Sequence, residues 1–127
     1  MVAALLLAWG YAASATAGDS GGAAVGTAAI APPTLSFDGM GAGFIGPSGA
    51  FTVAAVPPDA TGDVGPNNYV QAVNTSFAVF NKTGSVLLGP LPLKTLWTGF
   101  GGGCEVNNDG DPQVAYDPMA DRWVISK

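Results

Sequence analysis

The segment Glu105–Gly110 places oxygen-bearing side chains at alternate positions ahead of a glycine. This spacing matches the opening of a calcium-binding loop, in which hard oxygen ligands converge on a tight turn. The predicted calcium ligands are four neighbouring side chains: Glu105, Asn107, Asp109 and Asp111. The loop is incomplete, because Tyr116 stands where a bidentate glutamate would close it. The alternative interpretation is that the Asn and Asp residues form turns and cap local backbone amides.

A second acidic pair, Asp59 and Asp63, lies in a segment rich in Pro and Gly. Glycoside hydrolysis needs two carboxyl groups that flank one bond, so this pair is a candidate for that chemistry. The alternatives are a connection into the strand expected at Tyr69, or a loop that contacts a ligand or ion. Arg122, beside Asp121, suits either a carboxylate ligand or a salt bridge across its own turn.

Four aromatic side chains suit either a sugar-stacking platform or the core between sheets: Trp97, Phe100, Tyr116 and Trp123. The only cysteine, Cys104, is a poor candidate nucleophile, because a catalytic thiol needs a base and the chain has no histidine. We therefore expect Cys104 either to be buried or to pair with a cysteine outside this chain. No catalytic residue and no cofactor-binding residue is predicted, and the sequence is compatible with calcium as a cofactor.

Short strands with frequent turns must position these residues. The strands are expected at Leu35–Phe37, Phe51–Val56, Tyr69–Asn74, Phe77–Phe80, Val86–Leu88, Gln113–Tyr116 and Arg122–Ser126. Asn81–Gly84 and Asp117–Asp121 are expected to be hairpin turns, Pro90–Trp97 an extended segment or one helical turn, and Thr98–Cys104 a glycine loop. This pattern, without an amphipathic helix, predicts an all-β fold of antiparallel hairpins. The favoured architecture is the first blades of a β-propeller, incomplete in this chain, and a β-sandwich is the alternative.

The composition limits both fold and partners. The chain has 127 residues, enough for one domain, and its 19 glycines and 10 prolines disfavour long helices. Nine acidic residues against four basic ones give a net charge of −5. Nucleic acids and anionic membrane surfaces are bound mainly by Lys and Arg, so neither partner is expected.

The N-terminal residues resemble an export signal. An apolar run over Val2–Trp9 is followed by the small-x-small sequence Ala15-Thr16-Ala17, although no Lys or Arg precedes the run. The run is too short to span a bilayer. We therefore expect a signal peptide at 1–17, a flexible leader at 18–34, and a secreted β-rich segment at 35–127. That segment ends on a strand without a partner, which predicts the N-terminal piece of a longer protein.

Two stretches carry a resemblance to a family: PPDATGDVGPNNYVQAVNTSFAVFNKTGSVLLGP and LWTGFGGGCEVNNDGDPQVAYDPMADRWVIS. They resemble the N-terminal region of large exported bacterial proteins with a sialidase-like or kelch-like β-propeller. The resemblance implies an extracellular location and a propeller fold, with further blades completing the ring. The function expected from the sequence is a non-catalytic extracellular binding or structural module, with a glycan or a cell-surface protein as partner. The alternative is the N-terminal part of a secreted glycan-acting hydrolase with catalytic residues beyond this chain. A sialidase needs three arginines, and this region holds only Arg122.

Overall fold

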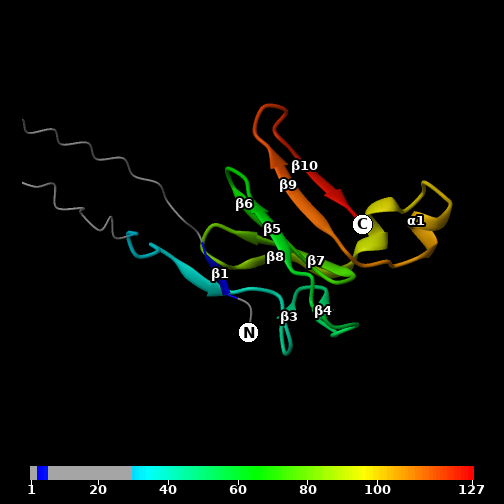
Figure 1. Ribbon diagram of the computed structural model, residues 1–127, viewed down its shortest axis with the longest axis horizontal. Coiled ribbons are helices and arrows are strands. Elements are labelled where there is room, and N and C mark those ends of the chain that lie inside the picture. The colour runs from blue at the N-terminus through cyan, green and yellow to red at the C-terminus, as the bar shows by residue number, and fades with distance from the viewer. Residues whose placement is uncertain (1–2, 6–29) are drawn as a thin grey trace, which may run out of the picture.

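The computed structural model describes residues 3–5 and 30–127 (Figure 1). The strands, in chain order, are β1 (Ala3–Leu5), β2 (Ser36–Asp38), β3 (Ile45–Gly46), β4 (Gly49–Ala50), β5 (Thr61–Val64), β6 (Asn68–Val73), β7 (Ser76–Asn81), β8 (Val86–Pro92), β9 (Gln113–Asp117) and β10 (Arg122–Ser126). A 3-10 helix η1 (Leu93–Trp97) and a single turn of helix α1 (Gly103–Val106) precede β9. All sheets are antiparallel, so the predicted all-β fold is confirmed.

The centre of the fold is a four-stranded sheet whose strands pair in chain order, β5-β6-β7-β8. Strands β6 and β7 are rich in β-branched and aromatic residues and meet at a two-residue turn, in which Asn74 has a φ of +53°. The next turn is built by Asn81, whose Oδ1 accepts hydrogen bonds from the amides of Thr83 (2.9 Å) and Ser85 (2.8 Å). The sequence therefore sets both turns through side chains that favour them.

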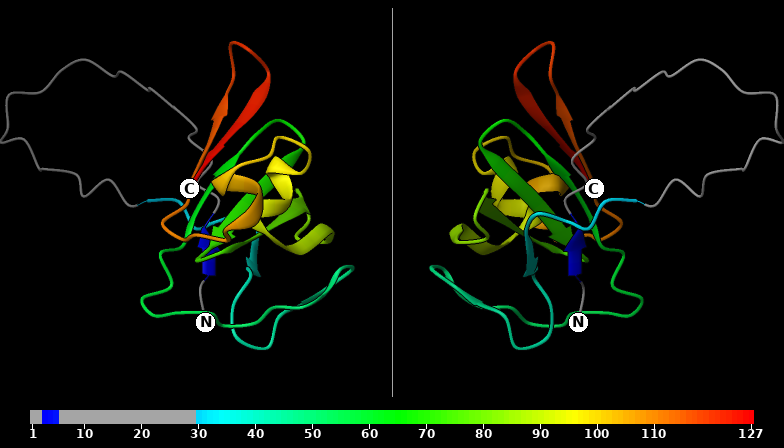
Figure 2. Two further views of the ribbon diagram at one scale, coloured as in Figure 1. Left: turned by 90° about the vertical axis from the view of Figure 1, so that its right-hand side faces the viewer. Right: turned by 90° about the vertical axis from the view of Figure 1, so that its left-hand side faces the viewer.

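Each face of this sheet carries a buried apolar cluster. One face packs against the segment that contains β3 and β4, through a cluster of Met40, Phe51, Val73, Ala78 and Phe80. The other face packs against η1 and the β9–β10 hairpin, through Val70, Ala72, Phe77, Leu93 and Val114. Figure 2 shows the sheet between the β3–β4 side and the β9–β10 hairpin. Alternation along each strand thus places apolar side chains on two opposite sides.

Two buried polar side chains hold the segment before β5 to the sheet. Gln71 Oε1 accepts a hydrogen bond from the Met40 amide (2.6 Å), and Asn74 Nδ2 donates to the carbonyl of Ala55 (2.7 Å). The strand expected at Phe51–Val56 does not form, so that prediction is wrong. Within this segment, the carbonyl of Ala55 accepts a hydrogen bond from the Asn74 side chain and not from a neighbouring strand. The two prolines that follow the segment interrupt strand pairing.

The segment Thr61–Val64 differs from expectation in the opposite sense. It was expected to be part of a connection, but it forms β5 and pairs with β6, where Val64 lies opposite Tyr69. Pairing with an established strand overrides the low β-propensity of Gly and Asp in this segment. The β9–β10 hairpin forms where predicted, and η1 supplies the helical turn expected within Pro90–Trp97.

The export signal and leader fall largely on residues 6–29, which lie outside the described residues, as does the predicted cleavage site. Strand β1 lies within the predicted signal peptide and pairs with β2. Across residues 3–5 and 30–127, no helix is long and apolar enough to cross a membrane.

Candidate functional site

The glycine loop between η1 and α1 is braced by one carboxylate. Glu105 Oε1 accepts a hydrogen bond from the Gly99 amide (3.0 Å), and Oε2 accepts one from the Gly101 amide (2.7 Å). Gly99, Gly101 and Gly102 all have positive φ, between +72° and +88°, a conformation that side chains rarely tolerate. The two amide bonds stabilise the charged carboxylate, so the pKa of Glu105 is lowered.

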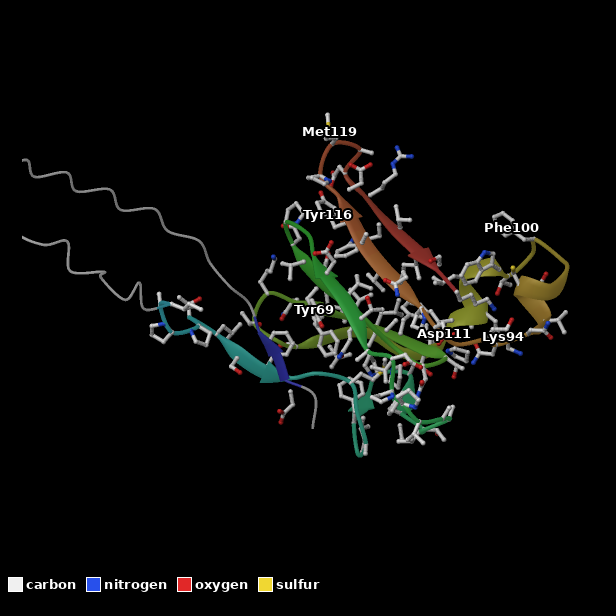
Figure 3. The ribbon with its side chains drawn as sticks, in the orientation of Figure 1. Tyr69, Lys94, Phe100, Asp111, Tyr116 and Met119 are labelled. Carbon is white, nitrogen blue, oxygen red and sulfur yellow. The ribbon has the colours of Figure 1, made fainter. Side chains whose placement is uncertain are left out.

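This braced loop presents Phe100 to solvent. The Phe100 side chain is 82% exposed. The backbone amide of Phe100 donates a hydrogen bond to the carbonyl of Trp97 (3.1 Å), which closes a tight turn. Leu96 and Val106, on either side of the loop, are also exposed apolar residues. Figure 3 shows the Phe100 ring pointing away from the body of the fold.

Lys127 closes the base of the same region. Its ammonium donates hydrogen bonds to the carbonyl oxygens of Cys104 (2.9 Å) and Asn107, and lies 5.0 Å from the ring centroid of Trp97. Trp97 also packs against the buried cluster beside the sheet, so its ring is a structural element and not a free platform. Cys104 is an exposed free thiol, so the first of its two expected states, burial, is wrong, and pairing with a cysteine outside this chain stays a prediction.

The four predicted calcium ligands are placed differently from one another. Glu105 is committed to the glycine loop, the Asn107 carbonyl accepts from Lys127, and Asp109 and Asp111 are exposed. Nowhere in the described part of the chain do three or more His, Cys, Asp or Glu side chains gather to hold a metal ion. Asn108, which was not a predicted ligand, uses its Oδ1 to accept from the Lys94 amide (3.0 Å). Calcium binding stays a prediction, without a converged ligand set to support it.

Asp63 joins the central sheet to the β9–β10 hairpin. Its Oδ1 accepts from the Val64 amide (2.7 Å), and its Oδ2 accepts from the Tyr116 amide on β9 (2.8 Å). Both carboxylate oxygens therefore have structural partners. Asp59 lies in an exposed irregular segment with a φ of +42°.

Tyr116 and Trp123 face each other across the hairpin and pack onto the sheet. Their ring centroids are 5.1 Å apart, and both rings lie over Gly65. A Cβ on Gly65 would come within 2.9 Å of Trp123 and 3.1 Å of Tyr116, so only glycine allows this approach. These two aromatics are packing residues, which leaves Phe100 as the exposed member of the predicted platform.

The acidic residues of the β9–β10 turn build the turn itself. Asp117 Oδ1 accepts from the amides of Met119 (2.9 Å) and Ala120 (3.1 Å). The Tyr116 hydroxyl donates to Asp121, and this hydrogen bond, with the nearby negative charges, raises the pKa of Tyr116 to about 12. Arg122 Nε donates to the Ala120 carbonyl (3.3 Å), so its bond is to the backbone of the turn.

A pocket of about 210 Å³ lies between β6 and the irregular segment before β5. Its lining is almost wholly apolar: Met40, Phe51, Val53, Val56, Pro58 and Val73. Asn74, the polar residue in the lining, already donates its side-chain amide to the carbonyl of Ala55.

The structural roles of Asn74 and Gln71 were not predicted from the sequence, because a side-chain amide that becomes buried has no distinguishing local pattern.

A scan against protein-family models finds no match, and searches of the curated proteins and of the solved structures find none.

Proposed function

We propose that this chain is a non-catalytic binding module of the extracellular space, built on the first blade and a half of a β-propeller-like fold. A propeller blade is a four-stranded antiparallel sheet of consecutive strands, and neighbouring blades stack face to face. The β5–β8 sheet has this strand order, and the β9–β10 hairpin stacks on one of its faces. A sandwich sheet carries polar residues on its outer face, whereas this sheet is apolar on both, which favours a blade.

The observation that carries the binding function is the exposed Phe100 on a loop braced by Glu105. A rigid aromatic contributes a large contact area and loses little conformational entropy on binding. Phe100 therefore suits the flat apolar face of a sugar ring or an apolar patch on a cell-surface protein.

The non-catalytic part of the proposal rests on what the carboxylates do. Asp63, Glu105 and Asp117 each accept backbone hydrogen bonds that hold a loop or a hairpin together. A general acid or base must instead reach the substrate, so that it can donate a proton to the substrate or accept one from it. The apolar run and Ala15-Thr16-Ala17 support export, which predicts that the secreted protein begins at Gly18.

An array of immobilised oligosaccharides tests this function directly. We expect the chain to bind a subset of the array, and Phe100→Ala to weaken that binding at least tenfold through loss of an aromatic anchor. Met119→Ala is the matched control, because Met119 is 97% exposed at the tip of the β9–β10 hairpin, well away from Phe100 in Figure 3. Equal binding by Phe100→Ala, or release of reducing sugar from the array, would contradict the proposal. Absence of binding to every oligosaccharide would exclude the glycan and leave a cell-surface protein as the proposed partner.

A further inference from the structure

The β9–β10 hairpin resembles the β5–β6 hairpin, most clearly in its second strand. Tyr69 and Val70 on β6 correspond to Trp123 and Val124 on β10, each 54 positions further along the chain. The registers differ by two residues, since Tyr69 lies opposite Val64 whereas Trp123 lies opposite Tyr116. A shift of two keeps every side chain on its own face of the sheet. By this correspondence β10 is the counterpart of β6.

The two counterparts differ in what lies beside them. The outer edge of β6 is taken by β7, and the face that carries Val70 is covered by the β9–β10 hairpin. Among the described residues, β10 pairs only with β9. Its face that carries Val124 is open, with that side chain 54% exposed. Within residues 3–5 and 30–127, no strand occupies the position beside β10 that β7 occupies beside β6.

The outer edges of the central sheet are obstructed, unlike that of β10. Strand β8 contains Pro90 and Pro92, and the Gly89 carbonyl accepts a hydrogen bond from the Ser48 amide (3.1 Å). The outer edge of β5 lies beside the β9–β10 hairpin, where Asp63 bonds the Tyr116 amide. Prolines and cover of this kind stop a sheet from adding strands. Strand β10 contains neither proline nor glycine.

We propose that the outer edge of β10 is a strand-accepting site, and that its occupant is an extended segment with the residue pattern of β7. Strand β7 pairs with β6 so that Phe80 lies opposite Tyr69, Val79 opposite Val70, and Ala78 opposite Gln71. The same antiparallel register on β10 sets the incoming aromatic residue against Trp123 and the incoming valine against Val124. Aromatic and β-branched cross-strand pairs of this kind stabilise an antiparallel ladder. The inference rests on the blade-like repeat in the proposed function.

A peptide that covers residues 74–84, with both ends blocked, is the probe. We expect it to bind the 127-residue chain and to slow hydrogen exchange at amides of β10 at least tenfold at saturation. The same peptide with Ala78→Pro should not bind, because proline cannot donate to the ladder.

Two variants of the protein locate the site. Val124→Asp should weaken peptide binding at least tenfold, since the carboxylate would be set against the incoming valine without a partner. Ala115→Asp is the matched control: Ala115 lies opposite Val124 on β9 and is exposed, but it is not on the β10 edge. Its binding should stay within twofold of that of the unsubstituted chain.

Three results would overturn the proposal: no slowing of β10 exchange at millimolar peptide, equal binding by Val124→Asp, or slowing at β8 in place of β10. A dimer with protected β10 amides in the absence of peptide would overturn the proposed occupant, because a second copy would then hold the edge. Hydrogen exchange of the chain without peptide separates failure of strand acceptance from failure of the blade arrangement. If the β9–β10 amides are protected but the chain binds no peptide, only strand acceptance fails. If the β9–β10 amides exchange as fast as in an unfolded chain, the blade arrangement in the proposed function fails as well.

Discussion

The central β5–β8 sheet and the region from the glycine loop to β10 are held together in different ways. The sheet is covered on both faces, and its largest fully buried side chain is Phe80. The hairpin is covered on one face, where Trp123 and Ile125 pack, while Val124 faces outward. Single polar contacts add to this packing, through Asp63 to the hairpin and through Glu105 within the glycine loop.

The difference indicates that apolar burial stabilises the central sheet, whereas the exposed glycine loop depends on a few polar contacts. Apolar burial stabilises roughly in proportion to the area removed from water and depends little on pH. A single carboxylate that accepts backbone amides contributes less, and its contribution depends on its charge. We therefore expect the sheet to be the last part to unfold and the loop that carries Phe100 to open locally at lower free energy.

Phe80→Ala is expected to have the largest effect, because it removes the ring at the centre of the first cluster. Phe80 contacts Phe37, Phe44 and Tyr69, with ring centroids 5.6 to 5.8 Å away. Loss of the ring should lower the free energy of unfolding by about 3–5 kcal/mol, measured by urea denaturation. Leu87→Ala, on the half-exposed side of β8, should cost below about 1 kcal/mol. A similar loss of unfolding free energy in both variants would contradict the proposal that burial within the central sheet dominates the stability.

Asp63→Asn should have an intermediate effect, confined to the hairpin. Asp63 uses a different oxygen for the Val64 amide and for the Tyr116 amide, and in asparagine one of these two positions carries an NH2 group, which cannot accept a hydrogen bond. One part-buried amide then lacks a partner, which should cost about 1–2 kcal/mol. The measurement is hydrogen exchange: β9 and β10 should exchange faster while β6 and β7 keep their protection.

Asp59→Asn is the control for this prediction, since Asp59 lies nearby in an exposed irregular segment and the substitution makes the same change in charge. It should leave exchange in β9 unchanged. Faster exchange throughout the sheet in Asp63→Asn would mean that hairpin and sheet unfold as one unit, against the division described above.

Much of the central sheet could be predicted from the sequence, because its signals are local. Alternating β-formers set β6 and β7, and the turn residues at Asn74 and Asn81 set the hairpins. The misplaced segments are those whose structure depends on distant partners. Strand β5 exists because β6 pairs with it, and the segment at Phe51–Val56 stays irregular because Asn74 bonds its backbone. Neither contact appears in a pattern read along the chain.

The candidate site was predicted in part. The sequence identified the segment Glu105–Asp111 as unusual, and turn formation was the alternative to calcium binding. What could not be predicted is the direction of the Glu105 carboxylate, which turns back onto glycine amides four and six residues earlier. Lys127 reaching the Cys104 carbonyl was equally hidden, because the two residues are 23 positions apart in sequence.

The smallest expected effect is the pH response of the glycine loop, and it tests whether a charge holds that loop. The Gly99 and Gly101 amides lower the pKa of Glu105 below its ordinary value near 4.5. The stabilisation from these bonds is therefore complete above pH 4.5 and is lost as the pH falls below it, through the folded pKa. The amide resonances of both glycines should shift together in an NMR titration, with a shared midpoint below 4.5. Glu105→Gln should abolish the shared midpoint and leave the unfolding free energy of the β5–β8 sheet unchanged. A midpoint at or above 4.5, or one that survives in Glu105→Gln, would show that the carboxylate does not brace the loop, and Phe100 would then lose its rigid support.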